Sequence, residues 1–267
     1  MNRKKTVYTV IIIAILLAVY GYEVFLNEKE KAQTVKTGET VKEHTKLYFM
    51  PSSTTGQVVH HHYYSLSYHE KHEQAEWVAY ELKKSQLAKT NYKRPYFEID
   101  QAVNTGAAHW RNYKNSGYDR GHLCPAGDRR FSKSAHDETF LTSNISPQEH
   151  EFNAGIWNRL EQKVRYWARK HDGLFVVTGG VLKNGMETIG HEGVAVPEYF
   201  YKVILDYNSG EPKMIGFLFP HKASNRPLRE FEVPTDTIEK LTGINFFEQL
   251  DDSVEDYLES TLTYSKW

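Results

Sequence analysis

The chain has 267 residues, of which 40% are hydrophobic and 25% charged, so it is long and apolar enough for one sizeable domain. Its net charge of −1 excludes a global basic field, and any affinity for a polyanion has to come from a local patch. The single cysteine, Cys124, excludes an intrachain disulfide, and we interpret it as a small buried residue rather than a reactive thiol.

Residues 1–26 predict a transmembrane signal anchor or a cleavable signal peptide. Basic residues at positions 3–5 precede an apolar run from Val7 to Tyr22. The run is slightly shorter than the ~20 residues that a spanning helix needs, although Phe25 and Leu26 extend it. The small-residue pattern of a cleavage site is weak, which favours the anchor. The basic flank would stay in the cytoplasm, so we expect the rest of the chain on the outer (periplasmic or extracellular) side, or secreted if the segment is cleaved.

The remaining chain divides into three parts. Residues 27–56 are polar and charged and predict a linker. Residues 57–251 are expected to form the functional domain, and residues 252–267, which are acidic and then aromatic, a C-terminal tail.

A group of histidines lies early in the domain, at positions 60–62, 69 and 72. Neighbouring side chains on a strand point to opposite faces, so three consecutive imidazoles do not converge easily on one ion. The spacing also matches no common zinc pattern. We therefore interpret this segment as strand or loop, with a zinc hydrolase as the alternative.

The most informative stretch is Asp119-Arg120-Gly121-His122. Cleavage of an anionic phosphodiester needs a base for water, positive charge near the phosphorus and help for the leaving oxygen. His122 suits the first task, because a free imidazole has a pKa of about 6.5. The guanidinium of Arg120 matches the geometry of phosphate oxygens. The carboxylate of Asp119 can orient neighbouring groups or hold water near a metal ion.

A second segment begins 31 positions after His122, at Asn153. Apolar residues recur at helical spacing between Gly155 and about Lys170, and Asn153 lies at or just before the start of this predicted helix. Glu161 follows roughly two turns later, about 80° around the axis. Direct binding of a magnesium-like ion by Asn153, with Glu161 acting through water, fits this spacing. The helix start also brings backbone N–H groups close to an anion.

Basic residues just after the first motif predict a local phosphate-binding patch, formed by Arg129, Arg130 and Lys133. Basic residues of the predicted helix could extend it, at positions 163, 165, 169 and 170. A solvated helix face explains this second group equally well.

These motifs resemble the DNA/RNA non-specific endonuclease family, the ββα-metal nucleases, and most closely its endonuclease G-like members. Residues 119–122 are similar to the signature of the family, in which His122 falls on the general base and Arg120 on an arginine that contacts phosphate. Asn153 falls on the single direct magnesium ligand, and Glu161 on the carboxylate that holds water on the metal. For a further arginine that some members use on the transition state, Arg111 is a candidate by position. The likeness covers roughly residues 58 to 250, including segments 64–68, 76–82, 140–148, 175–180, 194–203 and 216–220.

The resemblance implies a mixed α/β (α+β) domain with a central antiparallel sheet and a ββα-metal finger. It implies Mg²⁺ as the cofactor, with Mn²⁺ as a substitute, and DNA and RNA as the partners, cleaved to 5′-phosphate and 3′-hydroxyl ends. Loose sequence specificity follows, since phosphate contacts do not read bases. A homodimer stays open. The alternatives are a phosphodiesterase that acts on small nucleotides and a non-catalytic nucleic-acid-binding module, although a binder would not need His122.

Overall fold

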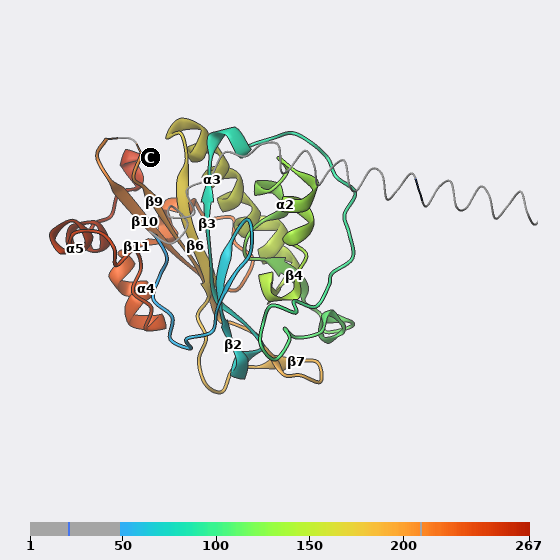
Figure 1. Cartoon of the computed structure of the whole chain (residues 1–267). Coiled ribbons are helices and arrows are strands. Elements are labelled where there is room, and N and C mark those ends of the chain that lie inside the picture. Colours follow the sequence, from blue (N-terminus) through green and yellow to red (C-terminus); the bar gives the residue numbers. More distant parts are fainter. Residues whose placement is uncertain (1–20, 22–48, 209) are drawn as a thin grey trace, which may run out of the picture. The chain divides into compact units, whose positions relative to one another are not determined.

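A seven-stranded antiparallel sheet organises the part of the chain that the computed structural model describes, which is residue 21 and residues 49–208 and 210–267 (Figure 1). The expected N-terminal helix and most of the expected linker lie outside the described residues. Within the described part, no helix combines the length and the apolar character needed to cross a membrane. The elements below belong to one compact unit, Lys46–Trp267.

The strands of the large sheet pair side by side in an order that differs from their order along the chain. In spatial order they are β1 (Val58–His60), β2 (Ser65–His69), β3 (Gln74–Leu82), β6 (Leu174–Gly180), β9 (Tyr199–Asp206), β10 (Lys213–Pro220) and β11 (Glu232–Val233). Every neighbouring pair is antiparallel. The central antiparallel sheet expected from the sequence is therefore confirmed.

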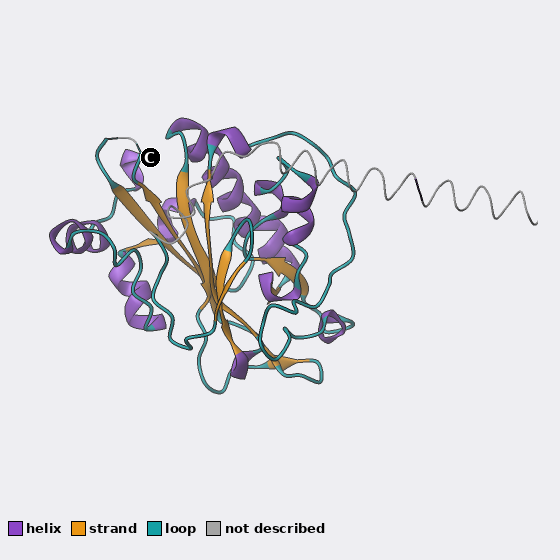
Figure 2. Cartoon of the chain, viewed as in Figure 1, coloured by secondary structure: helices purple, strands orange, loops and turns teal. Residues whose placement is uncertain are grey.

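Helices cover both faces of this sheet, and this explains why its central strands are apolar on both sides. Successive residues of β6 face opposite ways: Val176 packs toward helix α3 (Asn158–Lys170), and Val177 packs toward α4 (Thr235–Thr242) and α5 (Asp252–Ser260). Figure 2 shows the strands between these two groups of helices. The predicted C-terminal tail is part of this packing, since Trp267 contacts Trp167 with ring centroids 5.1 Å apart.

A smaller ribbon lies on the α3 side of the large sheet. It consists of β4 (Asp119–His122) and β5 (Ile145–Gln148), which pair antiparallel. The chain then enters a π-helical turn, η7 (Phe152–Trp157), and continues into α3. The predicted helix from Gly155 therefore becomes regular only at Asn158, because Gly155 has non-helical dihedral angles (φ −93°, ψ −105°).

The other elements are short. They are α2 (Lys133–Glu138), the hairpin of β7 (Thr188–Ile189) and β8 (Val194–Ala195), and the 3-10 turns η2 (Glu70–His72), η3 (Lys84–Gln86), η4 (Trp110–Tyr113), η5 (Ala126–Asp128), η6 (Thr142–Asn144), η8 (Leu228–Phe231) and η9 (Tyr264–Lys266).

Candidate functional site

Strand β4 carries three of the predicted site residues, and its alternation separates them. Arg120 and His122 project to one side of the strand, where both contact the ring of Phe97, at 5.3 Å from the Arg120 Cζ and 5.6 Å between ring centroids for His122. Asp119 projects to the other side. Gly121 lies against the buried side chain of Gln148, and a Cβ at this position would overlap it. The signature therefore needs glycine for packing.

His122 is held as a neutral imidazole. The rings of Phe97 and Phe140 pack against it, and its Nε2 is buried without a hydrogen-bond partner among the described residues. Burial, with the positive charge of Arg94 and the neighbouring His136, lowers the pKa of His122 to about 3. An unprotonated ring with an unpaired nitrogen can accept a proton, and with so low a pKa it needs negative charge nearby to do so efficiently.

The lowered pKa of His122 predicts a loss of stability in acid. The unfolded imidazole, with a pKa of about 6.5, binds protons that the folded one rejects, so stability is complete above that pH and falls as the pH drops toward 3. We expect the wild type to lose on the order of 1–3 kcal/mol relative to His122→Gln between pH 7 and pH 4. Chemical denaturation of both proteins at the two pH values, without metal, measures this difference. Parallel losses in the two proteins would contradict the assignment.

Asn153 lies in the π-helical turn, where Asp119 fixes its side chain. The Asn153 Nδ2 donates to Asp119 Oδ2 over 3.0 Å, and the Asn153 backbone N–H donates to the Glu149 carbonyl over 2.9 Å. The same carboxylate oxygen lies 3.0 Å from His150 Nδ1. Because the amide nitrogen faces Asp119, the carbonyl oxygen Oδ1 faces away from it. This is the orientation that a neutral oxygen ligand for a cation requires.

Glu161 belongs to a charge cluster under α3, which we define as Glu161, Arg165, Asp128 and Lys202. Arg165 Nη1 lies 2.7 Å from Asp128 Oδ1 and 3.9 Å from Glu161 Oε2. Tyr80 donates its hydroxyl to the other oxygen of Asp128 over 2.9 Å. This network ties α3 to β3 and to the turn η5 that follows the signature.

Lys202 is the unusual member of this charge cluster. It comes from the centre of β9, is 1% exposed, and its Nζ lies 4.8 Å from the ring of Trp157 with no hydrogen-bond partner among the described residues. Burial raises the pKa of Glu161 and the charge of Lys202 opposes this, whereas burial lowers the pKa of Lys202. The sequence analysis missed Lys202, although a lysine inside the apolar run 199–205 is a visible signal.

Arg120 pairs with a backbone carbonyl rather than with its neighbour Asp119. Its guanidinium donates to the Trp110 carbonyl over 3.2 and 3.4 Å. Arg94, a second residue that the sequence analysis missed, is exposed and lies over the rings of Phe97 and Phe140, at 5.4 and 5.5 Å. Both guanidiniums therefore lie around the aromatic residues that hold His122. Arg94 has no sequence motif to identify it.

One of the three residues of the expected basic patch does not lie on the surface. Arg129 is 1% exposed, and its Nη2 donates to the carbonyls of Tyr63 and Glu81, so it is not available for a surface phosphate. This corrects the sequence-based expectation, because sequence alone could not show that its guanidinium is buried. Lys133 pairs with Asp137 one turn along α2, and Arg130 is partly exposed.

Two further expectations concern the histidines and the cysteine. The three consecutive imidazoles bind different partners: His60 contacts Ser65, His61 contacts Asp100 and His62 contacts Glu138. Cys124 is buried, as expected, and burial raises the pKa of its thiol to about 12.

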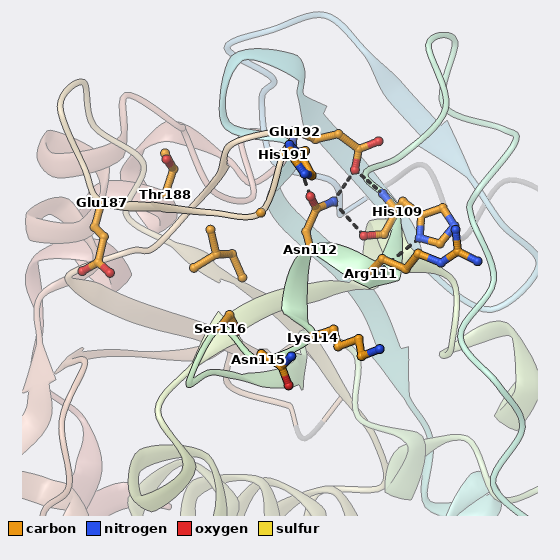
Figure 3. A pocket seen from close by; sticks show the side chains of 12 residues that line it. His109, Arg111, Asn112, Lys114, Asn115, Ser116, Glu187, Thr188, His191 and Glu192 are labelled. Atoms are coloured by element: carbon orange, nitrogen blue, oxygen red, sulfur yellow. Dashed lines mark hydrogen bonds between the residues drawn. The ribbon is translucent and has the colours of Figure 1, made fainter.

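A pocket of about 600 Å³ lies beside this region, between η4 and the loop over residues 187–192 (Figure 3). Its walls include Arg111, which the sequence made a candidate for the transition state. The guanidinium of Arg111 lies over the ring of Trp110, at 5.3 Å.

Comparisons with known proteins identify the family to which the chain belongs. A model of the DNA/RNA non-specific endonuclease family matches residues 44–253. The mitochondrial nuclease EXOG of Danio rerio is 38% identical over 202 residues, which cover 69% of this chain and 59% of that protein. The mitochondrial endonuclease G of Homo sapiens is 33% identical over 198 residues, which cover 68% of this chain and 67% of that protein. The chain thus spans less than two thirds of the length of the EXOG relative.

A solved structure is also similar. It is described as the crystal structure of the EndoG/EndoGI complex and the mechanism of EndoG inhibition, and it is 32% identical with a TM-score of 0.68. The match covers 73% of this chain and 87% of that one. It supports the mixed fold with a central antiparallel sheet.

The comparisons correct the placement expected from the N-terminal segment. The N-terminal segment predicted a membrane-anchored domain on the periplasmic or extracellular side, or a secreted one. Similar proteins of Danio rerio, Homo sapiens and Schizosaccharomyces pombe are instead named as mitochondrial nucleases. The outer-side placement is therefore contradicted.

Proposed function

Because the chain belongs to the DNA/RNA non-specific endonuclease family, we propose that it is a metal-dependent endonuclease that hydrolyses phosphodiester bonds in DNA and RNA with little sequence preference. The similar proteins are named as nucleases, which supports the reaction class. The observation that carries the proposal is the environment of His122: a neutral imidazole with an unpaired Nε2, close to the guanidiniums of Arg94 and Arg120.

In the proposed reaction His122 is the general base. Its Nε2 accepts a proton from water while the water oxygen forms a bond to phosphorus and the bond from phosphorus to the leaving oxygen breaks. Without substrate, burial and Arg94 keep the pKa of His122 far too low for efficient proton transfer. The negative charge of a bound phosphate offsets the positive charge of Arg94 and stabilises the protonated imidazole, so it raises this pKa. The base thus becomes effective when substrate is present.

The two arginines stabilise the negative charge that develops on the phosphoryl oxygens. Arg120 is oriented for this by its bonds to the Trp110 carbonyl, which leave the rest of its planar fork for phosphate. Arg94 is exposed and lies over the ring of Phe97. Neither residue recognises a base, so little sequence preference follows.

The oxygen ligands fit a hard divalent cation. Asn153 Oδ1, oriented by Asp119, and the carboxylate of Glu161 would hold Mg²⁺, or Mn²⁺ in its place, in the arrangement of a ββα-metal finger formed by β4, β5 and α3. The absence of thiolate and imidazole from this pair argues against zinc. When bound, the ion would supply Lewis-acid stabilisation of the phosphate and assistance to the leaving oxygen.

The proposal predicts metal-dependent nicking of supercoiled plasmid by the full-length chain. We expect nicked and then linear DNA with Mg²⁺, no cleavage with excess EDTA, and recovery when Mg²⁺ or Mn²⁺ is added back, because Asn153 and Glu161 bind the ion reversibly. A single-stranded RNA is expected to be cleaved in the same assay. Gel electrophoresis of both substrates measures this.

A folded protein that leaves plasmid and RNA intact with Mg²⁺, Mn²⁺ and Ca²⁺ would overturn the endonuclease proposal. Hydrolysis of bis(p-nitrophenyl) phosphate without plasmid nicking would instead favour a phosphodiesterase that acts on small substrates.

A further inference from the structure

Guanidiniums and aromatic rings alternate along a continuous series that starts beside His122. Arg94 and Arg120 lie over the ring of Phe97, at 5.4 and 5.3 Å. Arg120 and Arg111 lie over the ring of Trp110, at 5.8 and 5.3 Å. We call these five residues the cation–ring series. It groups three positive charges around two aromatic rings although the chain as a whole has no net positive charge.

The two ends of the series differ. At the inner end Phe97 contacts the ring of His122. At the outer end Arg111 is exposed and belongs to η4, whose first turn is capped by the Arg111 N–H donating to His109 Nδ1 over 3.0 Å. Along this series of contacts, Trp110, Arg120 and Phe97 come between Arg111 and His122.

The pocket at the outer end contains acidic as well as basic residues, and negative carboxylates there would oppose phosphate binding. Glu192 is used by the fold: its Oε2 accepts from the His109 N–H over 2.7 Å and from the side-chain amide of Asn112. Figure 3 shows Arg111 and Lys114 extending to the side of the pocket away from Glu187. This side is cationic and exposed, and it continues the cation–ring series.

We propose that Arg111, assisted by Lys114, binds a phosphate that flanks the scissile phosphate on the same strand. The ligand is therefore a polynucleotide strand rather than a mononucleotide, and the partly exposed ring of Trp110 offers a surface on which a base can stack. Arg111 is a substrate-positioning residue in this assignment. The inference rests on the proposed function, since it takes the phosphate at His122 as the scissile one.

The first test compares Arg111→Ala with Arg229→Ala, which removes an exposed arginine of η8. For a single-stranded 20-mer with Mg²⁺, we expect Arg111→Ala to raise KM about 5–10-fold and to leave kcat unchanged, because one phosphate contact is lost. The slope of log Kd against log salt should become shallower by about 0.7. Hydrolysis of bis(p-nitrophenyl) phosphate, which has no flanking phosphate, should stay at the wild-type rate. Arg229→Ala should behave as wild type in all three measurements.

A second test locates the contact. Binding of 20-mers that each carry one neutral methylphosphonate is measured in EDTA by fluorescence anisotropy. At one flanking position the neutral group should weaken the wild type and leave Arg111→Ala unaffected. Equal effects on both proteins at every position would overturn the proposal, as would an equal loss of activity on the small substrate. The binding measurement still decides the role of Arg111 if the wild type proves to cleave nothing, so the two proposals fail separately.

Discussion

Replacing His122 with alanine is expected to lower kcat for plasmid nicking by about 10²–10⁴-fold, the usual contribution of a positioned general base. The variant keeps both arginines, Asn153 and Glu161, so DNA binding and metal binding should change little. Loss of the imidazole removes only the group that accepts the proton from water. Initial rates at saturating DNA and Mg²⁺ measure the effect, with circular dichroism to verify the fold. His62→Ala is the matched control, because its side chain is 90% exposed and contacts Glu138 instead.

A purely structural role for His122 is the alternative to this prediction. If His122→Ala keeps more than about a tenth of the wild-type rate, a general-base contribution of the usual size is absent and His122 has a packing role between Phe97 and Phe140. The low pKa of His122 would then result only from its burial among aromatic rings and would not indicate a catalytic base.

The sequence predicted the parts of this site that are local. The spacing of apolar residues gave the helix that follows Asn153, and residue chemistry gave His122 and Arg120 as a pair around a phosphate. The π-helical turn at Gly155 was not predictable, because the dihedral angles of one glycine depend on how η7 meets α3. That turn nevertheless fixes where Asn153 lies relative to Asp119.

The parts that sequence missed come from distant segments. Arg94 reaches the site because Phe97 and Phe140, far apart in the chain, pack at 5.2 Å. Arg129 has the composition of a surface residue, yet its guanidinium is buried against the ring of Tyr80, at 4.7 Å. Both outcomes depend on tertiary contacts that no local pattern contains. The same limit applies to Lys202, whose partners come from α3 and η5.

Lys202 and Glu161 are expected to depend on each other for stability. Removing one charge of a buried pair leaves the other without compensation, so Lys202→Met and Glu161→Gln should each lower the free energy of unfolding by about 3–5 kcal/mol. In the double variant neither charge is buried, and the loss should be at least about 1 kcal/mol smaller than the sum of the single losses. Urea denaturation at pH 8 in EDTA measures all four proteins, under conditions in which metal binding to Glu161 plays no part.

Lys163→Met supplies the control for this cycle, since Lys163 also lies on α3 but directs its Nζ to the rings of Tyr166 and Trp167. Its effect should add to that of Glu161→Gln within about 0.5 kcal/mol. If Lys202→Met is equally additive with Glu161→Gln, then Asp128 and the ring of Trp157 are sufficient to hold Lys202, and its charge does not keep Glu161 ionised. If only Lys202 couples to Glu161→Gln, the buried charge of Lys202 keeps Glu161 ionised, and Glu161 is the carboxylate that we assign to the metal ion.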